Sequence, residues 1–173
     1  LVHGDLVRTW RELDDRAARL AAHLDAAGVG PGAKLACYLY NGPEYLEATF
    51  AAFKVRAAPI NVNYRYLEAE LEYLLDNADA EAVVFDVEFS DRLEHVRGAL
   101  PKVRVWLCVG ADDEHPAPVW AEDYEATIAR TAPMERIERS GDDLWFLYTG
   151  GTTGMPKGVM WPHRNLLSTA AAT

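Results

Sequence analysis

The stretch "DLWFLYTGGTTGMPKGVMWPH", from Asp143 to His163, is the part of the chain in which glycine, threonine, proline and lysine are most densely grouped. It begins with an apolar run that predicts a long strand over 143–149, and "GVMW" at 158–161 predicts a second strand. The glycines between them can adopt positive φ angles and bring backbone N–H groups close to an anion. We therefore expect two adjacent strands joined by a flexible connection over residues 150–157.

The side chains of this connection suit a phosphate group. Threonines supply short hydroxyl donors, and Lys157 supplies a positive charge at the end of a long side chain. Pro156 restricts the residue before it to an extended backbone, which stiffens the segment that carries the lysine. The candidate phosphate-binding residues are Thr149, Gly150, Gly151, Thr152, Thr153, Gly154 and Lys157.

Two other phosphate-binding patterns do not match this stretch. The pattern GxxxxGK[ST] needs glycine directly before the lysine and Ser or Thr directly after it, but here Pro156 and Gly158 flank Lys157. The dinucleotide pattern GxGxxG opens a helix, whereas the segment after these glycines is strand-like. A plain glycine-rich hairpin without a ligand is the alternative. Such a hairpin would not by itself need two threonines, a proline and a lysine within eight residues.

Strands and helices alternate along the rest of the chain. Helices are predicted from the capping-box pair Thr9 and Glu12 to Gly28, and over 43–56, 67–79, 90–100 and 121–131. Strands are predicted over 34–40, 58–63, 81–86 and 102–110, and a short hairpin is predicted at the N-terminus. Most of the strands are continuous apolar runs, which are typical of a parallel sheet covered on both faces. The pattern predicts an α/β fold, a layered and mostly parallel sheet with flanking helices.

Composition and charge narrow the classes of function. The 173 residues are 50% apolar, and their net charge of −10 argues against nucleic-acid binding, which needs a basic patch. No apolar run approaches the roughly 18 residues of a membrane span, so no transmembrane segment is expected. Residues 144–173 contain no Asp or Glu, which suits an anion site in an otherwise acidic chain. Cys37 and Cys108 lie in apolar runs, predict buried free thiols, and favour a cytoplasmic location.

Both ends of the sequence suggest a truncated domain. The chain opens on Leu1 rather than methionine and stops inside "NLLSTAAAT", a predicted helix without a capping residue after it. We therefore expect residues 1–173 to form a single partial domain of a longer chain.

Three weaker candidates have structural alternatives. "NVNYRY" at 61–66 follows a strand end, where open α/β sheets bind ligands, or else it is a polar turn with Arg65 in an ion pair. Asp142 and Asp143 are acidic neighbours that could suggest a metal, but a solvated turn and the start of a strand is the favoured explanation. His163 follows a proline and either adds positive potential or simply begins a helix.

The stretch "YTGGTTGMPKGV", Tyr148 to Val159, resembles the ATP phosphate-binding signature of the adenylate-forming enzymes, Thr/Ser-Gly-Thr-Thr-Gly-x-Pro-Lys-Gly. This family comprises acyl-CoA synthetases, luciferases and peptide-synthetase adenylation domains. The stretch from Thr9 to Tyr66 agrees with the N-terminal portion of the family, so that the resemblance covers nearly the whole chain. One departure is Gly150, where many members carry serine, which removes one hydroxyl ligand.

The resemblance implies that ATP activates a carboxylate as an acyl-adenylate, which a thiol such as CoA then takes up. The candidate residues would hold the β- and γ-phosphates of ATP, with Mg²⁺ assisting. None of them is a nucleophile, and neither a catalytic residue nor a metal ligand is expected within 1–173. The remaining site would lie beyond Thr173, so the chain alone is expected to be inactive.

The sequence looks most like the fatty-acyl and steroid-side-chain CoA synthetases of actinobacterial type. The expected partners are therefore a fatty or steroid carboxylate, ATP and CoA. An amino-acid adenylation domain and a non-catalytic nucleotide-binding remnant are the alternatives. Open sheet edges invite self-association, so a homodimer is one state that the fold allows.

Overall fold

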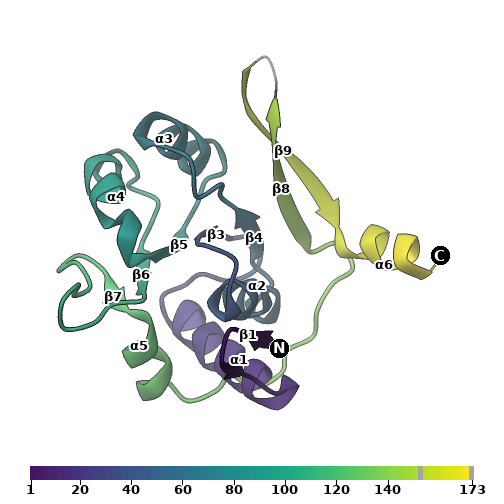
Figure 1. Ribbon diagram of the computed structural model, residues 1–173. Helices are drawn as coiled ribbons and strands as arrows, with labels where there is room; N and C mark the ends of the chain where they lie inside the picture. Colours follow the sequence, from purple (N-terminus) through teal and green to yellow (C-terminus); the bar gives the residue numbers. More distant parts are fainter. Residues whose placement is uncertain (152–153, 172–173) are drawn as a thin grey trace.

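A central sheet with helices on both faces organises the chain (Figure 1). The computed structural model describes residues 1–151 and 154–171. Within these residues the sheet has seven strands in the order β7-β6-β5-β3-β4-β8-β9, and a separate two-stranded hairpin lies at the N-terminus. The strands are β1 (Val2–His3), β2 (Leu6–Val7), β3 (Lys34–Tyr38), β4 (Ala58–Asn61), β5 (Ala82–Asp86), β6 (Val105–Val109), β7 (Glu122–Asp123), β8 (Leu144–Gly151) and β9 (Gly154–Pro162). The α-helices are α1 (Trp10–Ala26), α2 (Pro43–Val55), α3 (Glu68–Asn77), α4 (Ser90–Val96), α5 (Tyr124–Arg130) and α6 (His163–Ala171).

The sheet is parallel everywhere except at one edge. Strand β3 pairs in parallel with β4 and β5, and parallel pairing continues through β5–β6, β6–β7 and β4–β8. The final pair, β8–β9, is antiparallel. This arrangement confirms the predicted layered α/β fold with a mostly parallel sheet.

Alternate side chains of the central strands enter two separate cores. In β3, Leu35 and Cys37 face α1, α2 and α5, whereas Ala36 and Tyr38 face α3 and α4. Side chains of a strand alternate between the two faces of its sheet, so strands with helices on both faces must be apolar at every position. Figure 1 shows the same division, with α1, α2 and α5 on one side of the sheet and α3 and α4 on the other.

Local signals set the boundaries of the first helix as predicted. The N–H of Glu12 donates to Oγ1 of Thr9 at 3.2 Å, and the N–H of Thr9 donates to Oε2 of Glu12 at 2.7 Å. This reciprocal pair satisfies donors that the first turn of a helix leaves free. The helix ends at Ala26, and Gly28 follows with a φ of +77°, a conformation that favours glycine.

One short strand was not predicted. The expected helix over 121–131 begins only at Tyr124, because the carboxylate of Asp123 caps it by accepting from the N–H of Ala126 at 2.6 Å. The preceding Glu122–Asp123 pairs with β6 as the edge strand β7. A two-residue strand has no detectable period, which explains why the sequence pattern missed it.

Both cysteines are buried and free, as predicted. Burial raises the pKa of Cys37 and of Cys108 to about 12, so neither thiol ionises near neutral pH. Among the helices that the structure describes, none is long and apolar enough to cross a membrane.

Candidate functional site

The glycine-rich stretch forms the outer end of the β8–β9 hairpin, which extends away from the body of the molecule (Figure 1). The predicted adjacency of the two strands is confirmed, with Tyr148 opposite Gly158 and Thr149 opposite Lys157. The predicted flexible connection over 150–157 is wrong, because β8 continues to Gly151 and β9 already begins at Gly154. Backbone pairing between the strands orders most of this segment.

A bulge in β9 accommodates the proline of the motif. Between the pairs Thr149–Lys157 and Gly151–Gly154, β8 has one residue whereas β9 has two, Met155 and Pro156. Proline has no N–H for the ladder, and in sheets it is confined largely to bulges and edge strands. Pro156 is buried, whereas Met155 and Lys157 on either side of it are exposed. The bulge therefore leaves the lysine side chain facing solvent on a segment of restricted backbone.

The structure brings five of the seven candidate phosphate-binding residues to the same end of the hairpin. The hydroxyl of Thr149 lies 3.5 Å from the carbonyl oxygen of Lys157, a long hydrogen bond that a stronger acceptor could replace. Lys157 is absent from the ion pairs of the described residues, so the charge of its ammonium group is not neutralised by a neighbouring carboxylate there. The backbones of Gly150, Gly151 and Gly154 complete the end of the hairpin. The remaining two candidates, Thr152 and Thr153, lie outside the described residues.

An ion pair that the sequence did not indicate holds the base of the hairpin. The guanidinium of Arg56, which ends α2 with a left-handed φ of 64°, donates to the carboxylate of Asp143 at 3.0 to 3.2 Å. The same carboxylate accepts from the N–H of Ser140, and the carbonyl oxygen of Asp143 accepts from the N–H of His163 at 2.9 Å. The side chain of Asp143 is only 9% exposed. Of the predicted solvated turn and strand start, Asp142 is the solvated turn residue at 70% exposed, and Asp143 directly precedes β8, but its carboxylate is not solvated.

The ion pair between Arg56 and Asp143 predicts that the protein loses stability in acid. Burial alone would raise the pKa of Asp143, but the hydrogen bonds from Arg56 and from the N–H of Ser140 outweigh burial and lower it. A carboxylate whose pKa is lower in the folded state stabilises it fully above the unfolded pKa of about 3.9, and this stabilisation is lost as the pH falls through the folded pKa. We expect Asp143→Asn to remove this pH-dependent stabilisation. Below about pH 4 the free energy of unfolding of the variant should therefore fall less with decreasing pH than that of the wild type. Urea unfolding at several pH values measures both slopes, and equal slopes would contradict the prediction.

His163 begins α6, as its simpler interpretation expected. Its ring meets that of Phe53 edge-on at 4.7 Å between centroids, which packs α6 against α2. Burial lowers the pKa of His163, so its ring is neutral near pH 7 and adds no positive potential to the hairpin.

A polar hollow of about 230 Å³ opens at the carboxyl edge of the sheet, beside the hairpin. Its lining combines side chains that follow β3 and β4 with Tyr148 of β8. The residues that line it are Leu39, Asn41, Asn61, Val62, Asn63, Tyr64, Tyr66 and Tyr148. The carboxyl ends of parallel strands meet at one edge of a sheet, which is where open α/β sheets bind ligands. The prediction that the segment after β4 lies at such an edge is confirmed by this geometry.

An arginine from α4 fixes the segment that walls this hollow. Nη1 of Arg92 lies 2.8 Å from the hydroxyl of Tyr38 and 3.1 Å from the carbonyl oxygen of Tyr64. The hydroxyl of Tyr38 in turn donates to the carbonyl oxygen of Tyr66 at 2.8 Å. Arg65 was expected in an ion pair, but among the described residues its guanidinium instead lies over the ring of Tyr64, 5.4 Å from the centroid.

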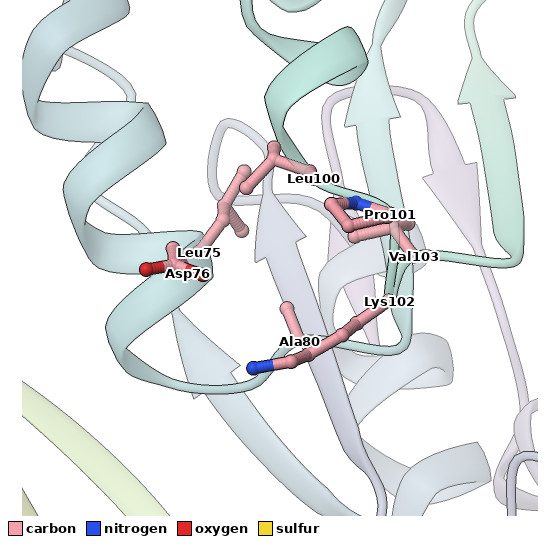
Figure 2. A pocket seen from close by; sticks show the side chains of 7 residues that line it. All are labelled: Leu75, Asp76, Ala80, Leu100, Pro101, Lys102 and Val103. Carbon is pink, nitrogen blue, oxygen red and sulfur yellow. The ribbon is translucent and has the colours of Figure 1, made fainter.

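A second hollow lies before the first residues of β5 and β6 and has a different character. Figure 2 shows it between the end of α3 and the segment that leads into β6, lined by Leu75, Asp76, Ala80, Leu100, Pro101, Lys102 and Val103. Its volume is about 10 Å³, at the lower limit of the space that one water molecule needs. It is too small for a substrate. The hairpin and the carboxyl edge are taken as the candidate site because the glycine-rich stretch and the ends of β3 and β4 meet there.

The sheet order, the helices on both faces and the glycine-rich terminal hairpin define a layered α/β protein with a mostly parallel sheet. The crystal structure of the anthranilate CoA ligase AuaEII in complex with anthranoyl-AMP superposes with a TM-score of 0.88, at 24% identity, over 97% of this chain and 32% of that one. The sequence model of the AMP-binding enzyme family matches residues 2–173. The chain therefore belongs to the AMP-binding enzyme family.

Relatives at higher identity are CoA ligases. The chain is 45% identical over 161 residues to the 3-oxocholest-4-en-26-oate–CoA ligase of Rhodococcus rhodochrous, covering 91% of this chain and 29% of the relative. It is 42% identical over 173 residues to the medium/long-chain-fatty-acid–CoA/3-oxocholest-4-en-26-oate–CoA ligase of Mycobacterium marinum, covering 96% of this chain and 31% of the relative. The chain thus spans about three tenths of the length of these curated relatives.

Proposed function

We propose that residues 1–173 form the N-terminal, ATP-phosphate-binding portion of an acyl-CoA synthetase, as a single partial domain. The complete enzyme would convert a fatty or steroid carboxylic acid, ATP and CoA into acyl-CoA, AMP and pyrophosphate through an acyl-adenylate. The observation that carries the proposal is the hairpin end, which pairs Thr149 with Lys157 beside three glycines; Lys157 is exposed and has no carboxylate partner among the described residues. Membership in the AMP-binding family and the names of the relatives support the same reaction.

The proposed role of the hairpin is to hold the pyrophosphate end of ATP while negative charge moves onto the leaving group. Lys157 supplies a point charge, the hydroxyl of Thr149 a donor, and the glycine backbones can approach the phosphate oxygens without hindrance from a Cβ. Donors that are already in place stabilise the developing charge without reorganising solvent. Thr152 and Thr153 have the same proposed role. None of these groups is the nucleophile, because the substrate carboxylate attacks the α-phosphate.

Magnesium would reach this site as part of Mg–ATP. Among residues 1–151 and 154–171 there is no cluster of three or more carboxylate, imidazole or thiolate side chains that could hold a metal. Mg²⁺ commonly binds through substrate phosphates and one or two carboxylates. The hairpin, which carries a lysine and no acidic residue, fits the phosphate oxygens of such a complex rather than the ion itself.

The names of the relatives favour fatty and steroid acids over amino acids as substrates. The Rhodococcus rhodochrous and Mycobacterium marinum relatives are both named as ligases that join such acids to CoA. The free buried thiols are in keeping with a cytoplasmic location. Strand β9 is an edge strand with exposed Met160 and Trp161, which supports self-association of the chain as a homodimer.

The proposal is tested by comparing two proteins. The first protein is residues 1–173 alone. The second, called the joined chain, consists of residues 1–173 followed by the C-terminal part of the Rhodococcus rhodochrous ligase, beginning where the segment matched by this chain ends. With ATP, Mg²⁺, CoA and a panel of fatty and steroid acids, we expect pyrophosphate from the joined chain and none from residues 1–173. The intact ligase is the control. A joined chain that unfolds cooperatively like the ligase but releases no pyrophosphate would contradict the proposed function, and turnover by residues 1–173 would contradict their incompleteness.

A further inference from the structure

Tyr148 is the point at which the outer part of the hairpin is tied to the body of the protein. Its hydroxyl donates to Oδ1 of Asn77, the last residue of α3, at 3.0 Å. Its neighbour along β8 is Thr149, which pairs with Lys157. We infer that Tyr148 and Asn77 are positioning residues that set the angle at which the end of the hairpin meets the carboxyl edge of the sheet. This inference rests on the proposed function of the hairpin and deepens it.

The ring of Tyr148 is seated on a glycine of the opposite strand. Tyr148 pairs with Gly158, and a Cβ added to this glycine would lie 3.0 to 3.3 Å from three atoms of the tyrosine ring and hydroxyl. Such distances are shorter than ordinary contacts, so a larger residue at position 158 would displace the ring. The motif glycine that follows Lys157 therefore has a packing role, which is to let Tyr148 cross the hairpin towards α3.

The acceptor belongs to a part of the molecule that is itself well fixed. Leu74 and Leu75 of the last turn of α3 are fully buried. Figure 2 shows Leu75 directed towards the segment before β6, and beside it Lys102 pairs with Asp79 at 2.5 Å. Asn77 is itself exposed, but the buried leucines beside it hold the end of α3 against the core, so it can serve as a reference point for the hairpin.

Few other described contacts could set this angle. Strand β8 joins the sheet through the pair Ile60–Phe146, and the Arg56–Asp143 ion pair lies at the base of the hairpin. Gly151 lies three residues beyond Tyr148, about 10 Å at the rise of an extended strand. A two-stranded ribbon is only marginally stable without further support. A small rotation about the base would therefore move the phosphate-binding end, and the Tyr148–Asn77 bond opposes that rotation.

Hydrogen exchange of residues 1–173 tests the contact without any nucleotide. We expect Tyr148→Phe, which keeps the ring and removes the hydroxyl, to speed exchange of the β8 and β9 amides about threefold, since one neutral hydrogen bond contributes modestly. Asn77→Ala should have the same effect, and the double variant should be no faster than either single one. Gly158→Ala should also speed exchange by displacing the ring. Tyr66→Phe is the matched control, because this tyrosine lines the same hollow and its hydroxyl makes no hydrogen bond to the described residues.

Kinetics of the joined chain separate positioning from general stability. We expect Tyr148→Phe and Asn77→Ala to raise the KM for ATP about threefold and to leave the KM for the carboxylate unchanged. Asn77→Asp retains the acceptor oxygen and should restore the wild-type KM for ATP. A purely structural role would lower the Tm and the amount of active protein without changing either KM.

The two hypotheses fail in different ways. Unchanged amide exchange in Tyr148→Phe would overturn the positioning inference whatever the activity of the joined chain. A wild-type joined chain that does not use ATP would overturn the proposed function, while the exchange measurements would still decide whether Tyr148 and Asn77 hold the hairpin.

Discussion

Replacing Lys157 by alanine in the joined chain is expected to lower kcat/KM for ATP by about 10² to 10³, the range observed when one preorganised donor to a developing charge is removed. The ammonium group is exposed at the end of the hairpin, and no neighbouring carboxylate among the described residues neutralises it. It is therefore available to the phosphates of ATP. The carboxylate substrate makes no use of this charge in the proposed geometry, so its binding should not change. Initial rates of pyrophosphate release at varied ATP and varied acid measure both effects.

Two variants make the result specific. Lys157→Arg keeps the charge but alters its shape and reach, and it should recover part of the loss. Arg130→Ala removes an exposed charge that pairs with Glu122 of β7, at the edge of the sheet opposite the hairpin, and it should change kcat/KM very little. If Lys157→Ala kept the wild-type dependence on ATP, the proposed role of the hairpin as a phosphate site would be wrong.

The alternation of strands and helices was predictable because its signals are local. The strand from Ala82 to Asp86 is buried on both faces and is therefore apolar without interruption. The start of α1 depends on two residues three positions apart, Thr9 and Glu12. Periodicity and capping act within one or two turns of the chain, so a single sequence carries them in full.

The extent of the hairpin was harder to predict. Glycines can turn the chain, but they can also pair in a ladder, and composition does not distinguish the two. Here the pairing of Gly151 with Gly154 extends both strands to within two residues of each other. The glycine-rich motif indicated that Thr149, the glycines and Lys157 come together. Their backbone conformation depends on the pairing between β8 and β9, which the motif does not reveal.

Contacts between distant residues left no signal in the sequence. Arg56 and Asp143 are 87 positions apart, and Asn77 and Tyr148 are 71 apart. Each is an ordinary polar residue at the end of a predicted element, and only the order of the strands brings the partners together. The polar hollow depends on the same order, because Tyr148 reaches it only when β8 lies beside β4.

A buried carboxylate outside the site gives the second large effect, this time on stability. Glu47 of α2 is fully buried, and its oxygens accept from Arg16 of α1 at 3.0 Å and from the hydroxyl of Tyr124 of α5 at 2.9 Å. Arg8, which follows the N-terminal hairpin, lies 2.8 Å from the same carboxylate. Burial, followed by the nearby charge of Glu47, raises the pKa of Tyr124 well above its ordinary value, so its hydroxyl remains a donor at all ordinary pH values. One side chain thus joins three helices and the N-terminal segment.

Glu47→Ala is expected to lower the free energy of unfolding of residues 1–173 by about 3 kcal/mol. Removing one partner of a buried ion pair costs about 3 to 5 kcal/mol because the remaining charge is left uncompensated. The lower end applies here, since the side chains of Arg8 and Arg16 are 14% and 17% exposed and can recover some hydration. Glu94→Ala is the control, because its pair with Arg97 lies at the surface and should contribute little to stability. Urea unfolding with an unchanged m value measures both differences. A loss for Glu47→Ala no larger than that for Glu94→Ala would mean that packing alone, and not this carboxylate, holds α1, α2 and α5 together.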